Sequence, residues 1–301
     1  MSGFPGGIAA ADVSSAAPGL GLAASVALVA ACLTTVLVDR LAAQRGFDPP
    51  GFSDPLRRLL AGLGLALLLL FAVFLPATTF NQSPEIDTEA LDWPQIFVSP
   101  LLLLLWLVLW LGCGFVGVRG ISRRRFAVVW RGAIGLRSRN IIGELTLGLA
   151  VGLAAWFAVL VASFALGLVL SASGRETLVA QEPAQLIVWM AGLPVTLRLA
   201  ISLAAGVSEE IFFRGFLQPR IGIGLSSLLF VGAHLGYGQP LMLFGITLLS
   251  LIYAALARWR GSVWAAISAH FLFDAVQLLV VIPTALRAYE TTAQNPVALL
   301  F

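Results

Sequence analysis

The sequence predicts an all-α fold, a polytopic membrane bundle of about eight transmembrane helices. The chain is 59% hydrophobic, and its mean hydropathy is +0.96. Only 11% of its residues are charged, whereas soluble domains carry about 25%. Its apolar runs repeatedly approach the roughly 20 residues that a helix needs to cross a bilayer. These observations indicate an integral, multi-pass membrane protein.

The predicted spans follow the apolar runs in chain order. Four clear runs lie in the first part of the chain, at residues 19–38, 59–75, 96–118 and 143–170. A fifth run, 186–218, is less regular because it contains Pro194, Arg198 and a pair of glutamates. Three further runs lie at residues 221–235, 241–257 and 262–283. The tryptophans mostly fall near the ends of these runs, which is typical of residues at the membrane interface.

The arginines set the predicted topology. All eighteen basic residues are Arg, and fifteen lie in alternate loops or at the span ends beside them, chiefly in 39–58 and 119–142. Because basic residues near spans stay in the cytoplasm, both termini are predicted to lie outside it, in a bacterial cytoplasmic membrane. The arginines at 123–125 are interpreted as an anchor on anionic lipid headgroups. Nucleic acid is not expected as a partner, since the basic residues lie in short loops between spans.

Four ionisable side chains on three predicted spans reach a similar depth. Counted at about 1.5 Å per residue from the cytoplasmic ends, Glu209 lies about 16 Å deep and His234 about 18 Å. His270 and Asp274 lie about 13 and 20 Å deep. That level is close to the middle of a hydrocarbon core of roughly 30 Å. Such groups are costly against lipid, so we expect them to meet in a hydrated cavity open to the cytoplasmic side.

Helical spacing separates the roles of neighbouring residues. Glu210 and Arg214 are four apart with the acid first, which favours an ion pair that holds Glu210 ionised. Glu209 points about 100° away on the same helix, which leaves it available for chemistry. His270 and Asp274 are also four apart. Asp274 could therefore orient His270 or form a second polar contact beside it.

Two kinds of chemistry fit these residues. A carboxylate such as Glu209 can take a proton from water, while imidazoles stabilise an oxyanion. Alternatively, Glu209, His234, His270 and Asp274 could bind a divalent metal such as Zn²⁺. Sequence spacing does not separate a metal-bound water from a metal-free mechanism. A purely structural ion pair and interhelical hydrogen bonds form the competing interpretation, with Phe230 packing on the face of His234.

Three motifs resemble the CPBP family, also called the ABI or CAAX-protease-and-bacteriocin-processing family. They are EEIFFR at 209–214, FVGAH at 230–234 and HFLFD at 270–274. The resemblance covers about residues 143–285, which suggests a catalytic transmembrane core. It leaves residues 1–142 as three N-terminal spans with Arg-rich loops, and residues 286–301 as a tail.

The resemblance implies a membrane-embedded endopeptidase of the CAAX prenyl endopeptidase type. It implies that Glu209 activates water and that His234, His270 and Asp274 complete the catalytic cluster. Glu210, Arg214 and Phe230 would support it. The third motif ends in Asp274, where the prenyl endopeptidases have Asn. Because an ionised Asp cannot donate a hydrogen bond, this favours an orienting or metal-ligand role for Asp274.

The sequence therefore predicts hydrolysis of peptide bonds in membrane-associated proteins or peptides, with the lipid bilayer as the other partner. The alternative is a non-catalytic membrane scaffold of the same fold, such as a bacteriocin-immunity or secretion partner. A proton-coupled transporter is less favoured, because related halves with paired broken helices are not evident.

Overall fold

The computed structural model describes residues 17–78, 91–118, 123–175, 178–179 and 185–287. These segments contain helices, turns and bends but no strand, which confirms the predicted all-α bundle. Six helical segments are long and apolar enough to cross a membrane: Gly21–Gln44, Pro55–Thr78, Trp93–Phe115, Ile141–Ala172, Pro240–Arg260 and Trp264–Arg287. Both termini of the chain lie outside the described residues.

The N-terminal half supplies three of these six segments before the long helix α6. Its elements are α1 (Ala17–Gln44), η1 (Pro50–Ser53), α2 (Pro55–Leu69), η2 (Leu70–Phe74), α3 (Leu75–Thr78), η3 (Trp93–Phe97), α4 (Val98–Phe115), α5 (Arg123–Ala133) and α6 (Ile141–Ala172). Local chemistry fixes some helix starts. The Asp54 side chain accepts the backbone N–H of Leu56 at the start of α2, and Asn140 accepts that of Gly143 at the start of α6.

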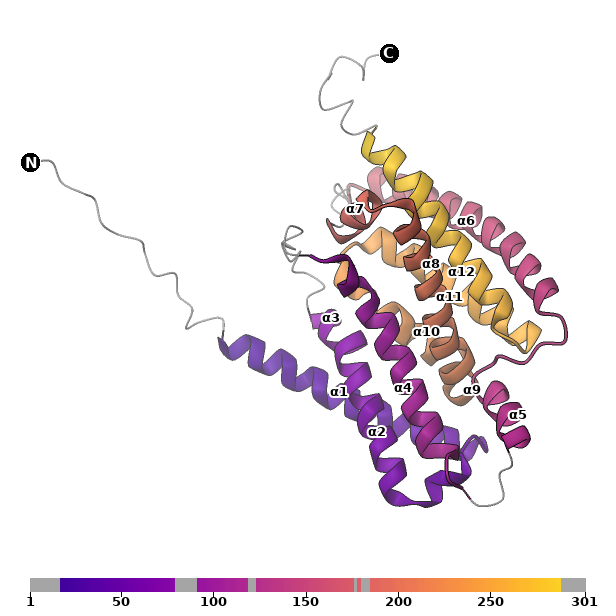
Figure 1. Ribbon diagram of the computed structural model, residues 1–301. Helices are drawn as coiled ribbons and strands as arrows, with labels where there is room; N and C mark the ends of the chain where they lie inside the picture. The colour runs from indigo at the N-terminus through magenta and orange to yellow at the C-terminus, as the bar shows by residue number, and fades with distance from the viewer. Residues whose placement is uncertain (1–16, 79–90, 119–122, 176–177, 180–184, 288–301) are drawn as a thin grey trace, which may run out of the picture.

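The C-terminal half contains shorter elements. They are α7 (Gln185–Gly192), α8 (Val195–Glu209), η5 (Glu210–Leu217), α9 (Gln218–Ile221), α10 (Ile223–Gly232), η6 (Leu235–Tyr237), α11 (Pro240–Arg260), α12 (Trp264–Val276) and η7 (Gln277–Val281). Helix α12 packs against α6, α8 and α11. Helix α2 packs against α1 and α4, while α4 contacts α8 and η5, and α1 contacts α9. Figure 1 shows α1, α2 and α4 on one side of the bundle.

Two predicted spans differ from the structure, so a count of eight is not confirmed. The run 186–218 is broken, because Pro194 caps a new helix that then carries buried charged residues. The run 221–235 becomes α10 followed by the 3₁₀ turn η6, ending at Tyr237. Fifteen helical residues extend only about 22 Å, less than a hydrocarbon core of roughly 30 Å.

Small residues allow the close packing of α6 on α12. A Cβ at Gly152 would lie 2.7 Å from the Ala269 carbonyl oxygen, and one at Gly148 would collide with Ser268 and Ala265. In membranes, where water does not drive helices together, such small-residue contacts let two backbones approach and gain dispersion energy. This packing fixes the position of α12, the helix that carries His270.

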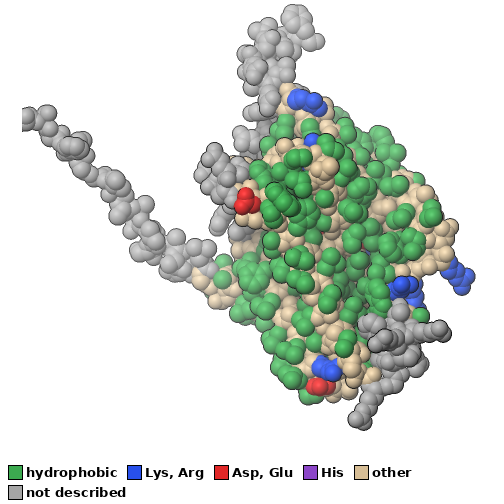
Figure 2. Space-filling view, in the orientation of Figure 1, with side chains coloured by type: hydrophobic (Ala, Val, Ile, Leu, Met, Phe, Trp, Pro, Cys, Tyr) green, Lys and Arg blue, Asp and Glu red, His purple; other side chains and the backbone are tan. Residues whose placement is uncertain are grey.

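Aromatic side chains join the N-terminal helices to the C-terminal core. Trp106 and Trp110 of α4 are buried and pack edge-on against Phe216 of η5, at ring-centroid distances of 4.7 and 5.0 Å. The interpretation of tryptophans as interface residues is therefore wrong for these two. The outer face in Figure 2 is mostly apolar, with few charged side chains, which lie near its periphery. A bilayer covers such a surface.

Candidate active site

The helix that carries the paired glutamates widens at the site. Helix α8 ends at Glu209 and continues as η5, a π-helix in which all eight residues are buried. The turn is closed by a hydrogen bond from the N–H of Gln218 to the carbonyl of Phe213, five residues back. Single π-turns inside α-helices frequently occur at functional sites. Here the widened turn carries both Glu210 and Arg214 into the interior.

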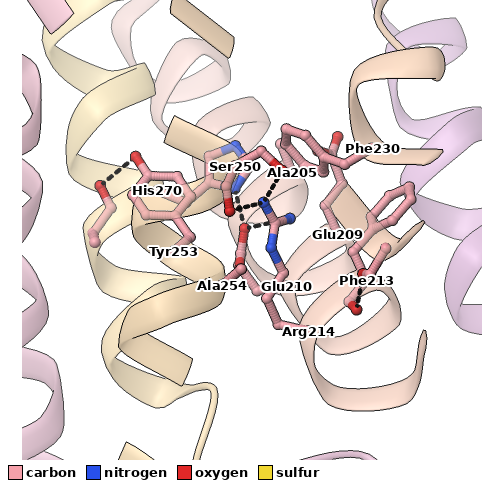
Figure 3. A network of polar contacts seen from close by, with 12 residues as sticks. Ala205, Glu209, Glu210, Phe213, Arg214, Phe230, Ser250, Tyr253, Ala254 and His270 are labelled. Carbon is pink, nitrogen blue, oxygen red and sulfur yellow. Dashed lines mark hydrogen bonds and ion pairs between the residues drawn. The ribbon is translucent and has the colours of Figure 1, made fainter. Parts of the chain in front are cut away.

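Glu210 and Arg214 form a buried ion pair. The Glu210 Oε1 atom lies 3.1 Å from Arg214 Nη1, and their side chains are 0% and 1% exposed. Arg214 also donates to Ser250 Oγ at 3.2 Å and lies over the Phe230 ring, 4.0 Å from its centroid (Figure 3). A charge in this surrounding persists only with such partners. The predicted pairing of these two residues is thus present.

The same carboxylate orients His270. Its Nδ1 lies 2.9 Å from Glu210 Oε1, and because a carboxylate paired with Arg214 only accepts, Nδ1 must donate. Tyr253 of α11 stacks on the imidazole, with ring centroids 5.4 Å apart. The other nitrogen, Nε2, lies 3.4 Å from Asp274 Oδ2. His270 is therefore fixed from the inside by Glu210, while Asp274 is the polar contact on its outer nitrogen.

The end of α10 orients His234. The backbone N–H of His234 bonds the carbonyl of Val231, three residues back, which leaves the carbonyl of Phe230 available. The side-chain Nδ1 of His234 lies 2.8 Å from that carbonyl oxygen. A carbonyl only accepts, so Nδ1 carries a proton, and in the neutral imidazole Nε2 keeps its lone pair. The local helix ending thus selects the tautomer.

Glu209 and His234 face each other. Glu209 Oε2 lies 3.9 Å from His234 Nε2, and each side chain is about one-fifth exposed, at 19% and 18%. Oε2 itself is buried and has no hydrogen-bond partner among the described residues. The separation exceeds a direct hydrogen bond of about 2.7–3.2 Å. The pair presents one strong acceptor and one lone pair to a shared space.

The two halves of the site adjoin at Phe230. Its ring lies 4.7 Å from the His234 ring and 6.1 Å from the His270 ring, centroid to centroid. Of the predicted residues, the structure pairs Glu209 with His234 and links Glu210 to Arg214 and His270. These contacts come from η5, α10 and α12 and their immediate flanks.

The residues do not fit the metal shell that the sequence allowed. That shell comprised Glu209, His234, His270 and Asp274. In the part of the chain that the structure describes, no group of three His, Cys, Asp or Glu side chains is placed to hold a metal ion. The described contacts join these four residues as two separate pairs, Glu209 with His234 and His270 with Asp274.

Sequence reasoning missed three polar side chains at the site. Ser250 and Tyr253 on α11 contact Arg214 and His270, respectively. Tyr237 lies against His234, with ring centroids 5.8 Å apart. No motif contains them. The available signal was the presence of Ser250 and Tyr253 three residues apart on a mainly apolar span, since polar groups in spans often face the bundle interior.

The site lies within a segment similar to known proteins. Residues 191–276, from α7 to α12, match the family model Type II CAAX prenyl endopeptidase Rce1-like. Over this segment, the resemblance to the CPBP family is confirmed. The chain is 35% identical to the uncharacterized protein YpbD of Bacillus subtilis (strain 168) over 77 residues, and these residues make up 25% of this chain. The alignment spans 41% of that relative's length. No solved structure matches the chain at a significant level.

Proposed function

We propose that the protein is a membrane-embedded endopeptidase that hydrolyses peptide bonds of membrane-associated polypeptides with water activated by Glu209. The observation that carries this proposal is the buried, unpartnered Oε2 of Glu209, 3.9 Å from the bare Nε2 of His234. The family match adds support, because its name describes a CAAX-type endopeptidase.

A single water fits this pair of acceptors. A molecule about 2.8 Å from each atom can bridge the 3.9 Å gap between Glu209 Oε2 and His234 Nε2. It donates one proton to each acceptor, so its lone pairs point toward the remaining space, where a peptide carbonyl can approach. Both side chains are partly exposed, which leaves a path to them. This geometry suits a general base and an orienting group.

His270 is the proposed donor to the oxyanion. Its Nδ1 proton is held by Glu210, so a second proton on Nε2 gives an imidazolium whose outward donor lies beside Asp274. This positive charge partly balances Glu209, Glu210 and Asp274, of which Glu210 alone pairs with Arg214. A preorganised donor in a water-poor site stabilises developing negative charge strongly.

The reaction balances without another reactant. The water oxygen attacks the carbonyl carbon while Glu209 takes one proton, and the carbonyl oxygen becomes an oxyanion facing His270. When the tetrahedral intermediate collapses, the C–N bond breaks and Glu209 returns its proton to the leaving nitrogen. The products are a carboxylic acid and an amine, and both catalytic groups regain their starting states.

Comparative mass spectrometry of membrane peptides tests this function. Membranes from cells producing the wild-type protein, Glu209→Gln or Glu144→Gln would be analysed for new peptide ends. Glu144 is a matched control, because it pairs with Arg260 at 2.8 Å on α6 and α11 and lies outside the motifs. We expect the same new ends with wild type and Glu144→Gln, and their loss with Glu209→Gln.

If the protein is a non-catalytic scaffold, the opposite result is expected for Glu209→Gln. If the protein acts only by binding a partner, Glu209→Gln leaves the set of peptide ends and the cellular phenotype unchanged. In that case, replacing Glu210 would still unfold the protein, since its contacts hold η5 to α12. Identical peptide ends in wild type and Glu209→Gln would overturn the endopeptidase proposal.

A further inference from the structure

A cavity lies between the N-terminal helices and the helix that carries the paired glutamates. It has a volume of about 40 Å³ and is lined by residues of α1, η1, α2, α4, η5 and α9. One water needs roughly 10–15 Å³ of such space, so the cavity has room for several waters or one compact anion. Its walls are mainly apolar and aromatic, but Thr35 and Arg220 also line it.

Arg220 is a buried cation without a carboxylate partner among the described residues. Its side chain is 1% exposed and lies over the rings of Phe216, at 4.0 Å, and Trp110, at 4.8 Å. Nη1 donates to the Phe216 carbonyl at 2.6 Å and to that of Ala133 at 3.2 Å. Nη2 is buried and has no hydrogen-bond partner in this part of the chain. A buried charge in this state is costly.

Thr35 adds a second orphaned polar atom to the same cavity. Its Oγ1 is buried and has no partner among the described residues. Such groups normally bond to protein or to ordered molecules. Two donors, one of them charged, thus line one small space from two elements, α1 and α9.

The two acids in the cavity wall share one arginine, Arg58, which leaves one negative charge over. Asp39 lies 2.9 Å from Arg58 Nη2, and Asp48 lies 3.2 Å from Arg58 Nη1. Arg220 forms no ion pair with either of them in the described structure. The cavity also lies near the Arg-rich face, because Arg45 donates to the Pro219 carbonyl beside Arg220. In the predicted topology this Arg-rich face is cytoplasmic, at the level of the lipid phosphates.

We propose that this cavity binds a phosphate group, with Arg220 and Thr35 as its hydrogen-bond donors. Guanidinium pairs well with phosphate oxygens, and a hydroxyl completes the set. We favour the headgroup of an anionic lipid as the source, and free phosphate is the other source of this chemistry. The ligand joins α1 to α9, so the N-terminal helices contribute a wall to a binding site beside the family-matched core.

Lipid binding to the purified full-length protein tests the proposal. Native mass spectrometry in detergent would count bound phosphatidic acid, with diacylglycerol of the same acyl chains as the phosphate-free probe. Inorganic phosphate added as a competitor shows whether free phosphate, in place of a lipid headgroup, occupies the cavity. We expect phosphatidic acid to bind and diacylglycerol not to bind. Displacement by millimolar inorganic phosphate would assign the site to the free anion.

Three variants connect binding to the cavity. Thr35→Val keeps side-chain volume and removes one donor to a charged group, so we expect about tenfold weaker binding. Gly62→Leu fills the cavity, since a Cβ at Gly62 meets Thr35 in ordinary contact at 3.8 Å. Arg220→Met should abolish binding. Thr247→Val is the control, because its hydroxyl bonds Leu243 within α11, away from the cavity.

The outcomes are separable from the proteolytic function, because binding is measured without any substrate. Loss of phosphatidic acid in the cavity variants, but not in Thr247→Val, supports the site even if no peptide is ever cut. If Arg220→Met fails to fold, Thr35→Val and Gly62→Leu carry the test. Equal binding of both lipids, or equal binding of phosphatidic acid to wild type, Thr35→Val and Gly62→Leu, would overturn it.

Discussion

Glu210 accepts the Nδ1 proton of His270 at 2.9 Å, so one buried carboxylate holds both the imidazole and Arg214. The second glutamate of the pair is thereby the organising group of the site. It fixes the side chain that faces the proposed oxyanion, while the first glutamate faces His234. The two adjacent glutamates contact different partners because the helical turn points their side chains in different directions.

Removing one partner of this network should unfold the protein more readily. Arg214→Met leaves Glu210 charged and buried without its guanidinium, which costs about 3–5 kcal/mol. The free energy of unfolding can be compared by denaturant titration in detergent. Arg58→Met is the control, because its pairs with Asp39 and Asp48 are partly exposed and contribute about 0–1 kcal/mol.

The double variant Glu210→Gln with Arg214→Met sharpens this prediction. We expect it to lose less stability than the sum of the two single variants, because no lone charge then remains in the interior. Simple additivity would mean that the two side chains do not depend on each other, contrary to their 3.1 Å contact.

Replacing His234 should slow catalysis without unfolding the chain. His234→Ala removes one of the two acceptors of the proposed water, and we expect the cleavage rate to fall by about 10²-fold or more. Its side chain is partly exposed and makes no buried ion pair, so the unfolding midpoint should change little. Single-turnover cleavage of a peptide identified by the proteomic comparison would measure this. An unchanged rate would remove His234 from the mechanism.

Two glycines on α6 should respond in opposite ways to alanine. A Cβ at Gly148 collides with Ser268 and the Ala265 carbonyl, so Gly148→Ala should separate α6 from α12 and destabilise the protein. A Cβ at Gly167 meets nothing within 4 Å, so Gly167→Ala should be neutral or stabilise the helix by up to about 1 kcal/mol. Thermal unfolding of both variants in the same detergent checks this contrast.

Chelation should leave cleavage unchanged. The described side chains offer no group of three placed to hold a metal ion. We therefore expect protein treated with a strong chelator, with metal content measured by mass spectrometry, to keep its full rate. A rate that falls with the metal content and returns on adding Zn²⁺ would show that the groups rearrange to form a shell.

The pairing of Glu210 with Arg214 could be predicted from the sequence because the relevant information is local. Chain position alone gives the helical spacing of Glu210 and Arg214 and the depth of a residue counted from the Arg-rich face. It also shows that the chain has only two histidines. Residues brought in from another helix could not be found that way. Ser250 and Tyr253 belong to no motif, and their contacts with Arg214 and His270 depend on how α11 packs.

Helix irregularities also escaped prediction. Nothing in the composition of Glu210–Leu217 distinguishes a π-helix from an α-helix, because the wider turn is selected by packing around it. The early end of α10 was missed for a related reason, since apolar residues continue to Leu235. The burial of Trp106 and Trp110 likewise depends on their contact with Phe216, far away in sequence.

The early end of α10 determines where a proton resides. The carbonyl of Phe230 is left to the imidazole of His234, because the backbone N–H of His234 turns to Val231. Were the helix to continue by regular turns through Gly236 and Gly238, the imidazole would share that carbonyl with the backbone N–H of His234. Related chains could thus retain all three motifs and still hold this imidazole differently, since the loop after the histidine determines which hydrogen bond the ring makes.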